Sequence, residues 1–154
     1  MTMTLQELSD REEIRILMAT LAQAGDIRDM PTYMGAFTAD GTLELPIFKA
    51  TGRDNMERVL TADPDARAKL KAVRHNITSS KITFTSDTTA EGRSYFIVYY
   101  GVGPDHMGHY ADQFKKVDDV WELAYRKVNF DWISDTSRAA PTEELRNKML
   151  SWAP

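Results

Sequence analysis

Cysteine is absent from the 154-residue chain, and this absence excludes disulfides, thiolate nucleophiles and metal sites with sulfur ligands. Long hydrophobic runs are also missing: no window approaches the ~20 apolar residues that span a bilayer, and Met1 to Leu8 lacks the basic and apolar stretches of a secretory signal. The formal net charge is -4, so no basic stripe is available to neutralise nucleic-acid phosphates. We therefore expect a cytoplasmic protein that binds neither membranes nor nucleic acids.

The chain does contain enough apolar residues to build a packed core. Hydrophobic residues make up 42% of it and charged residues 27%, values close to those of ordinary globular proteins. This composition argues against a disordered tail. We expect a single domain over residues 1–154, with its core at about 9–133.

The first predicted helix begins at a capping box. Ser9 and Glu12 have the spacing with which a hydroxyl and a carboxylate satisfy the free N–H groups of a helix start. Gly25 is predicted to end this helix, which leaves Asp26 just past it. The apolar stripe of this helix consists of Ile14, Leu17, Met18 and Leu21.

A second, short helix is predicted at Asp29-Met30-Pro31, because an aspartate cap followed by a proline suits a first helical turn. Asp40-Gly41 predicts a turn, and the run Thr42 to Phe48 predicts a strand that Pro46 interrupts. Two further helices are expected over residues 52–60 and 64–72.

The second half of the chain is rich in β-forming residues. Strands are predicted over His75–Thr85, Gly92–Gly101, Gly108–Val117 and Val120–Ile133. Asp118-Asp119 has the length of a tight hairpin turn between the last two. Consecutive hairpins imply an antiparallel sheet, and helices followed by strands imply an α+β fold. A loop over residues 134–140 and a final helix over 141–150 complete the prediction.

Several short motifs, in order along the chain, resemble the SnoaL-like branch of the nuclear-transport-factor-2-like superfamily, which includes scytalone dehydratase and hexachlorocyclohexane dehydrochlorinase. The resemblance covers about Glu12 to Ile133. Its motifs are Ile14-Arg15-Ile16-Leu17, Gly25-Asp26, Phe37-Thr38-Ala39-Asp40-Gly41, Thr51-Gly52-Arg53, Val73-Arg74-His75-Asn76, Gly92-Arg93-Ser94-Tyr95 and Lys115-Lys116-Val117-Asp118-Asp119-Val120-Trp121. It implies a cone-shaped α+β barrel, in which a curved antiparallel sheet wraps around N-terminal helices and encloses an apolar pocket.

The resemblance also implies that Asp26 and His75 match the catalytic aspartate and histidine of both enzymes. An imidazole can take a proton at physiological pH when a partner fixes its tautomer, and a carboxylate is such a partner. His75 would then be the general base, and neither metal nor cofactor would be needed. The alternative is that Asp26 only ends a helix and His75 is a hydrogen-bonded residue at the start of a strand.

A base alone does not stabilise the negative charge of a reaction, so hydrogen-bond donors are expected in the pocket. The dehydratase would have tyrosines where this chain has Gly25 and Leu45, which makes scytalone itself a doubtful substrate. Tyr110 is the preferred donor, because Tyr110, Asp112 and Phe114 alternate and share one face of a strand. Other candidate substrate-binding residues are Tyr33, Tyr95, Tyr99, Arg126 and Asn129.

His106 and His109 form an H-x-x-H pair that suggests a metal site. In a strand, however, side chains three apart point to opposite faces, and no third ligand lies at a diagnostic spacing. We therefore predict no metal and expect solvated loop histidines, with His109 able to reach the pocket mouth.

The residues and the resemblance together favour a cofactor-free lyase or isomerase that acts on a hydrophobic, cyclic small molecule. Two alternatives stay open: a binding or assembly module with the same fold, and a polyketide cyclase or ketosteroid-type isomerase that uses another carboxylate, such as Asp112. A curved sheet leaves an apolar outer face, so we also expect a homo-oligomer, a dimer or a trimer.

Overall fold

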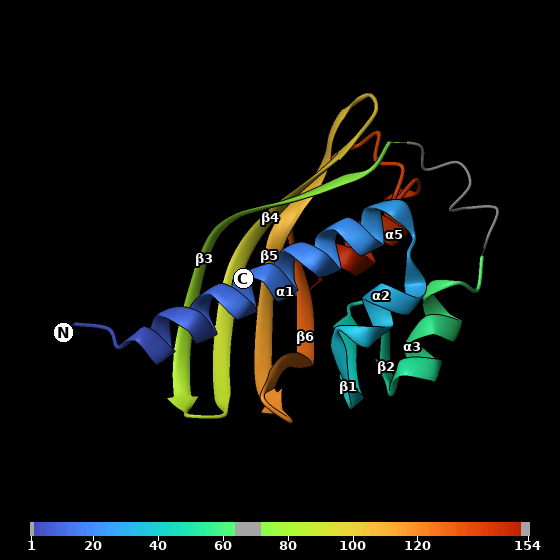
Figure 1. Ribbon diagram of the computed structural model, residues 1–154. Helices are drawn as coiled ribbons and strands as arrows, with labels where there is room; N and C mark the ends of the chain where they lie inside the picture. The colour runs from blue at the N-terminus through green and yellow to red at the C-terminus, as the bar shows by residue number, and fades with distance from the viewer. Residues whose placement is uncertain (1, 64–71, 152–154) are drawn as a thin grey trace.

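The computed structural model describes residues 2–63 and 72–151, which form one six-stranded sheet and the helices packed against it (Figure 1). The strand order across the sheet is β2-β1-β6-β5-β4-β3. The strands are β1 (Phe37–Leu45), β2 (Phe48–Thr51), β3 (Arg74–Ser86), β4 (Thr89–Tyr100), β5 (Gly103–Val117) and β6 (Val120–Ile133). Strands β2 and β3 are the outer strands, so the sheet is curved but not closed, and the α+β prediction is confirmed.

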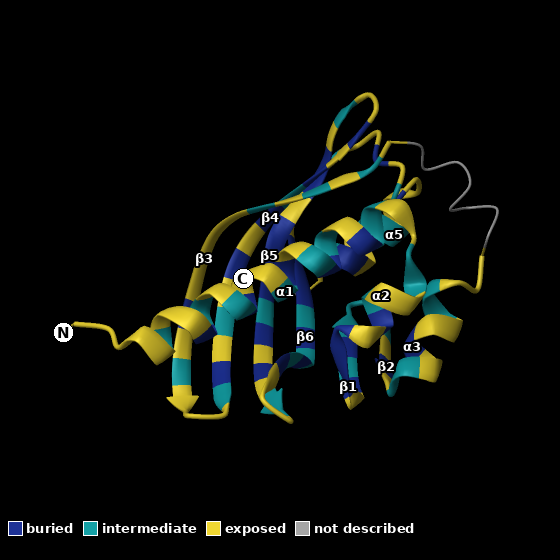
Figure 2. Ribbon diagram, viewed as in Figure 1, coloured by how far each residue is buried: buried dark blue, intermediate teal, exposed yellow. Residues whose placement is uncertain are grey.

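The helices are α1 (Leu5–Ile27), α2 (Met30–Gly35), α3 (Arg53–Leu60) and α5 (Glu143–Leu150). Figure 1 shows α1 crossing one face of the sheet, with α2 and α3 beside β1 and β2. Buried positions alternate with exposed ones along β4 and β5, as the banding in Figure 2 shows. The buried residues of the strands meet those of α1, such as Ile14 and Leu21, to form the core. Each such large apolar side chain contributes roughly 1.5–3 kcal/mol by leaving water.

Helix α1 begins earlier than the capping box at Ser9 predicted. Its N-cap is Thr4, which forms a capping box with Glu7, while Ser9 lies inside the helix and donates to Glu13 at 3.1 Å. Further along the helix, the buried carboxylate of Asp10 accepts hydrogen bonds from the Lys116 ammonium and the Trp121 indole at 2.6 and 2.9 Å, which attach α1 to the sheet.

Helix α1 also ends later than Gly25. It reaches Ile27, and Arg28 closes it in the left-handed region at φ 62°. Asp26 therefore lies in the last turn of the helix, and the prediction that it follows the helix is wrong. Helix α2 begins as predicted, because Asp29 caps it by accepting from the backbone N–H of Thr32 at 3.1 Å.

The predicted turn at Asp40-Gly41 is wrong, since both residues lie inside β1. The pairing of β1 with β6 shifts register between Phe37 and Thr42, and this irregularity accommodates the turn-forming residues. A larger residue at Gly41 would be crowded there, because a Cβ would lie 3.0 Å from the carbonyl oxygen of Thr38. Pro46 separates β1 from β2, as predicted.

The four long strands and the hairpin at Asp118-Asp119 are confirmed. Both turn residues have positive φ, 48° and 62°, as a type I′ turn requires. The prediction of a fully antiparallel sheet is wrong for one pair of strands, because β1 and β6 run parallel. No hairpin joins these two strands, so the connection does not force them to run in opposite directions.

The helix predicted over residues 64–72 falls on a segment that lies outside the described residues. The final helix is confirmed; it begins at Glu143, two residues later than predicted, and ends at Leu150 as predicted. Within the described part of the chain, no helix combines the length and the apolar character needed to cross a bilayer.

Candidate active site

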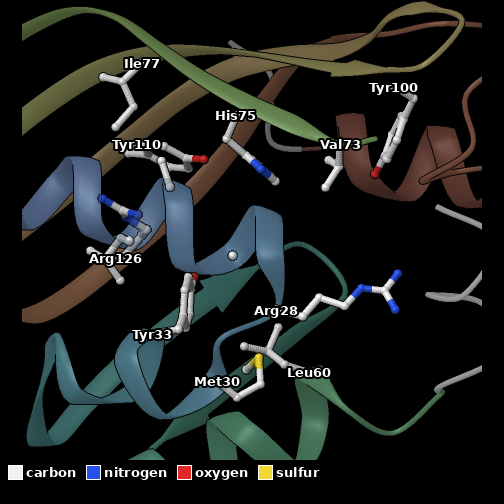
Figure 3. A pocket seen from close by; sticks show the side chains of 13 residues that line it. Arg28, Met30, Tyr33, Leu60, Val73, His75, Ile77, Tyr100, Tyr110 and Arg126 are labelled. Carbon is white, nitrogen blue, oxygen red and sulfur yellow. The ribbon is translucent and has the colours of Figure 1, made fainter. Parts of the chain in front are cut away.

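A hollow lies between the C-terminal half of α1, helix α2 and the inner face of the sheet. Its first chamber has a volume of about 240 Å³. Figure 3 shows the ring of His75 and the hydroxyl ends of Tyr33 and Tyr110 turned toward this space. The lining also includes Leu21, Gly25, Arg28, Met30, Leu60, Val73, Ile77, Tyr100 and Arg126. Helices and four different strands therefore contribute to one chamber that is mainly apolar.

Asp26 and His75 meet at this chamber. The last turn of α1 positions Asp26, and the start of β3 positions His75. The Nδ1 atom of His75 lies 2.7 Å from Oδ1 of Asp26, and the backbone N–H of His75 donates to the same oxygen at 3.0 Å. The Asp26 side chain is 7% exposed and the His75 side chain 30%.

The contact with Asp26 determines which ring nitrogen of His75 carries the proton. A carboxylate accepts hydrogen bonds, so Nδ1 of His75 carries the proton and the neutral ring has its lone pair on Nε2. No hydrogen bond to another described residue uses Nε2 of His75. The arrangement can therefore present a base to a ligand in the hollow.

Tyr110 and Arg126 lie across the chamber from the helix. Strand β5 turns Tyr110 inward, where its ring stacks on Phe96 with centroids 4.4 Å apart. The guanidinium of Arg126 lies 4.1 Å from the centroid of the Tyr110 ring on its way to Asp112, with which it makes two hydrogen bonds of 2.8 and 2.7 Å.

Burial sets the protonation of these donors. Burial raises the pKa of Tyr110 well above its usual range, so its hydroxyl keeps the proton and can donate a hydrogen bond. Burial also opposes the charge of Arg126, but the adjacent carboxylate of Asp112 outweighs this effect and raises the pKa of Arg126. The site thus holds a neutral phenol and a cation whose charge Asp112 balances.

Three residues predicted to bind substrate do not reach the hollow. Tyr95 and Tyr99 are 48% and 42% exposed, and Asn129 is buried but does not line either chamber. The alternation of side chains along a strand explains why these residues do not reach the hollow. Tyr95 and Asn129 both pair with His109, one residue away from Tyr110, and therefore lie on the opposite face of the sheet. Tyr33 and Arg126, in contrast, do line the hollow.

Tyr33 lies next to Gly25, one of the two positions where the resemblance led us to expect a tyrosine. A Cβ on Gly25 would lie 3.6 Å from the Tyr33 ring, so the space beside this glycine is filled from α2. Leu45, the second such position, lines a further chamber of about 320 Å³. That chamber shares Tyr33, Leu60, His75, Tyr100, Tyr110 and Arg126 with the first.

The expectation of solvated loop histidines is wrong for both His106 and His109. Both lie in β5 and are buried. His106 lines the second chamber with Nδ1 2.8 Å from Asp105, whereas Nδ1 of His109 lies 3.1 Å from Asp131. Each imidazole therefore has its own carboxylate. No group of three or more potential metal ligands occurs in residues 2–63 and 72–151.

Sequence reasoning missed His106 as a residue of the hollow. Val98 pairs with His106 but Tyr99 pairs with Pro104, so Asp105 is the extra residue of a β-bulge. Asp105 and His106 bond to each other beside this bulge. His106 lies four residues before Tyr110, so alternation along a strand that begins at Gly103 puts both on the same face.

Comparison with known proteins agrees with this architecture. The model of the SnoaL-like domain matches residues 6–127. Similar solved structures include a provisionally assigned scytalone dehydratase from Novosphingobium aromaticivorans, with 24% identity, TM-score 0.76, and coverage of 86% of this chain and 91% of the other.

A hexachlorocyclohexane dehydrochlorinase, LinA-type3 from Novosphingobium barchaimii, has 15% identity and TM-score 0.72, with 84% and 92% of the two chains covered. A protein of unknown function from Mycobacterium tuberculosis has 23% identity and TM-score 0.72, with 92% and 85% covered. A search of curated proteins found no match. The family model covers most of the chain, and the protein therefore belongs to the SnoaL-like domain family.

Proposed function

We propose that the protein is a cofactor-free lyase or isomerase that acts on a hydrophobic, cyclic small molecule. The observation that carries the proposal is the 2.7 Å contact between Asp26 and His75 at the wall of a mainly apolar hollow. The fold relatives described as a dehydratase and a dehydrochlorinase support the same class of chemistry.

In this mechanism, Nε2 of His75 removes a proton from a carbon atom of the substrate. The electron pair of the broken C–H bond forms a new C=C bond, and the leaving group departs with its own bonding pair. Asp26 keeps the imidazole in the reactive tautomer and stabilises the imidazolium that forms. The leaving group is a halide, in which case the imidazolium later releases its proton to solvent, or a hydroxide that takes this proton from the imidazolium and leaves as water.

Tyr110 and Arg126 are the donors that face the negative charge of this reaction. Tyr110 offers its hydroxyl, and Arg126 has N–H groups beyond the two that bind Asp112. Donors fixed in a buried site stabilise developing charge without reorganising. The chemistry uses only groups of this chain.

An isomerase or cyclase that uses Asp112 as its base is less consistent with the geometry. Both carboxylate oxygens of Asp112 bind the guanidinium of Arg126, and its side chain is only 1% exposed. A base must contact the proton that it abstracts, and His75 meets this requirement better.

The experiment is a screen of cyclic halides and β-hydroxy ketones for formation of the alkene or enone. We expect His75→Ala and Asp26→Asn to lower turnover of any substrate found, His75→Ala by about 10²- to 10⁴-fold. Tyr110→Phe keeps the stacked ring and should lower turnover less. Unchanged turnover in both His75→Ala and Asp26→Asn would show that the mechanism is wrong.

A further inference from the structure

The hollow contains a second histidine–carboxylate pair, in the chamber that lies beyond Tyr110 and Arg126. His106 is 8% exposed and its Nδ1 atom lies 2.8 Å from Oδ2 of Asp105. This pair is separate from Asp26 and His75 and has no part in the mechanism above. Both pairs nevertheless border the second chamber, which His75 and His106 line together.

Asp105 is held in place by three donors. Besides the ring of His106, it accepts from the hydroxyl of Ser137 and from the backbone N–H of Arg138, both at 2.6 Å. Burial would raise the pKa of Asp105, but these hydrogen bonds outweigh it and hold the pKa below the usual range. Asp105 is therefore an ionised acceptor, which fixes the proton of neutral His106 on Nδ1.

When the ring of His106 is neutral and its proton is on Nδ1, the Nε2 atom carries a lone pair. No described residue donates a hydrogen bond to it. Its surroundings are mainly apolar: the rings of Phe130, Phe96 and Tyr100 lie 5.4, 6.1 and 6.5 Å away between centroids, and Leu45, Phe48 and Val128 also line the chamber. A polar atom of a residue that lines such a chamber gains from a hydrogen-bond donor on the ligand.

We propose that His106 is a ligand-binding residue that accepts a hydrogen bond from a hydroxyl group at the far end of an extended, apolar, cyclic ligand. Such a ligand reaches from His75 into the second chamber, with its apolar rings between the two imidazoles. The inference rests on the proposed function only in assuming that the hollow takes an apolar cyclic ligand. It names the polar group that this ligand carries.

The test measures binding and does not depend on turnover. The probes are 2-naphthol and 2-methylnaphthalene, which differ only by a hydroxyl in place of a methyl group. Dissociation constants are measured at pH 8, where an ordinary imidazole is neutral, for the wild type, His106→Leu and the control His75→Leu. We expect the wild type to bind 2-naphthol about five- to tenfold more tightly, a preference that His106→Leu loses and His75→Leu keeps.

A second variant covers the case in which His106→Leu does not fold. In Asp105→Asn, the amide oxygen can accept from Arg138 while the amide N–H₂ donates to Nδ1 of His106, which moves the ring proton to Nε2. We expect this variant to shift its preference from 2-naphthol toward 2-acetylnaphthalene, which only accepts.

The possible results distinguish the role of His106 in binding from the proposed role of His75 as the base. Equal binding of 2-naphthol and 2-methylnaphthalene by the wild type, or a preference that persists in His106→Leu, overturns the role of His106 and leaves His75 as the proposed base. An unchanged preference in Asp105→Asn also overturns it. Failure of the wild type to bind either naphthalene overturns both this inference and the apolar ligand of the proposed function.

Discussion

One carboxylate oxygen of Asp26 contacts His75 twice, at the ring Nδ1 atom and at the backbone N–H. The end of α1 and the start of β3 are therefore joined by the same group that orients the imidazole. This arrangement couples the fold to the site, because a shift of either element would also turn the ring.

The buried pair of Arg126 and Asp112 gives a stability prediction. Asp112→Ala removes one partner and leaves the guanidinium buried without compensation, so we expect the free energy of unfolding to fall by about 3–5 kcal/mol. The measurement is urea denaturation followed by far-UV circular dichroism. The double variant Asp112→Leu/Arg126→Met should recover most of the loss. A decrease below about 1 kcal/mol in Asp112→Ala would contradict the account.

Asp105 predicts a stability change at low pH. Its folded-state pKa is held below the ordinary 3.8, so below that pH the unfolded chain binds the proton more readily than the folded one. This contribution to stability is complete well above pH 3.8 and decreases as the pH falls through the lowered value. We expect Asp105→Asn to be less stable than the wild type at pH 7, with a difference that narrows below pH 3.8. A difference that stays constant from pH 7 to pH 3 would count against this prediction.

Much of the fold could be predicted from the sequence, because the signals were local. Alternating β-formers marked the long strands, and Asp29 and Asp118-Asp119 marked a cap and a turn. The start of α1 also has a local signal, because Thr4 and Glu7 form a capping box of the same kind as the one predicted at Ser9 and Glu12. The parallel pairing of β1 with β6 joins strands that are far apart in the sequence, so no local pattern predicts it.

Part of the candidate site could also be predicted from the sequence. The resemblance pointed to Asp26 and His75, and the structure brings them together. Tyr95, a candidate substrate-binding residue, lies on the face of the sheet away from the hollow, because it pairs with His109 and not with Tyr110. His106 was missed because the strand was predicted to begin at Gly108, whereas β5 begins at Gly103 and places His106 on the same face as Tyr110.

Gly108 is predicted to be required for the packing of β5 against β6. A Cβ at this position would lie 1.9 Å from the carbonyl oxygen of Asn129, which belongs to the backbone and cannot move aside easily. We expect Gly108→Ala to lower the melting temperature and the free energy of unfolding by roughly 3 kcal/mol or more. Gly35→Ala is the matched control, since nothing lies within 4 Å of the added methyl group. Equal stability of the two variants would disprove the requirement.

The outer face of the sheet supports the proposal of a homo-oligomer. Ile97, Met107 and Trp132 are neighbours across β4, β5 and β6, and the last two are largely exposed. We expect sedimentation velocity to detect a dimer or trimer that Met107→Glu shifts toward monomer. Gln113→Glu, further along the same face of β5, should leave the association unchanged. A wild type that sediments as a monomer would refute the proposal.

Deuterium incorporation into a cyclic ketone tests the central claim, proton removal by His75, most directly. The protein is incubated with 2-tetralone in D₂O, and loss of the signals of the protons next to the carbonyl is followed by NMR. We predict exchange at least about 10²-fold faster with the wild type than with His75→Ala, and intermediate exchange with Asp26→Asn. Equal exchange rates with the wild type and His75→Ala would contradict the account.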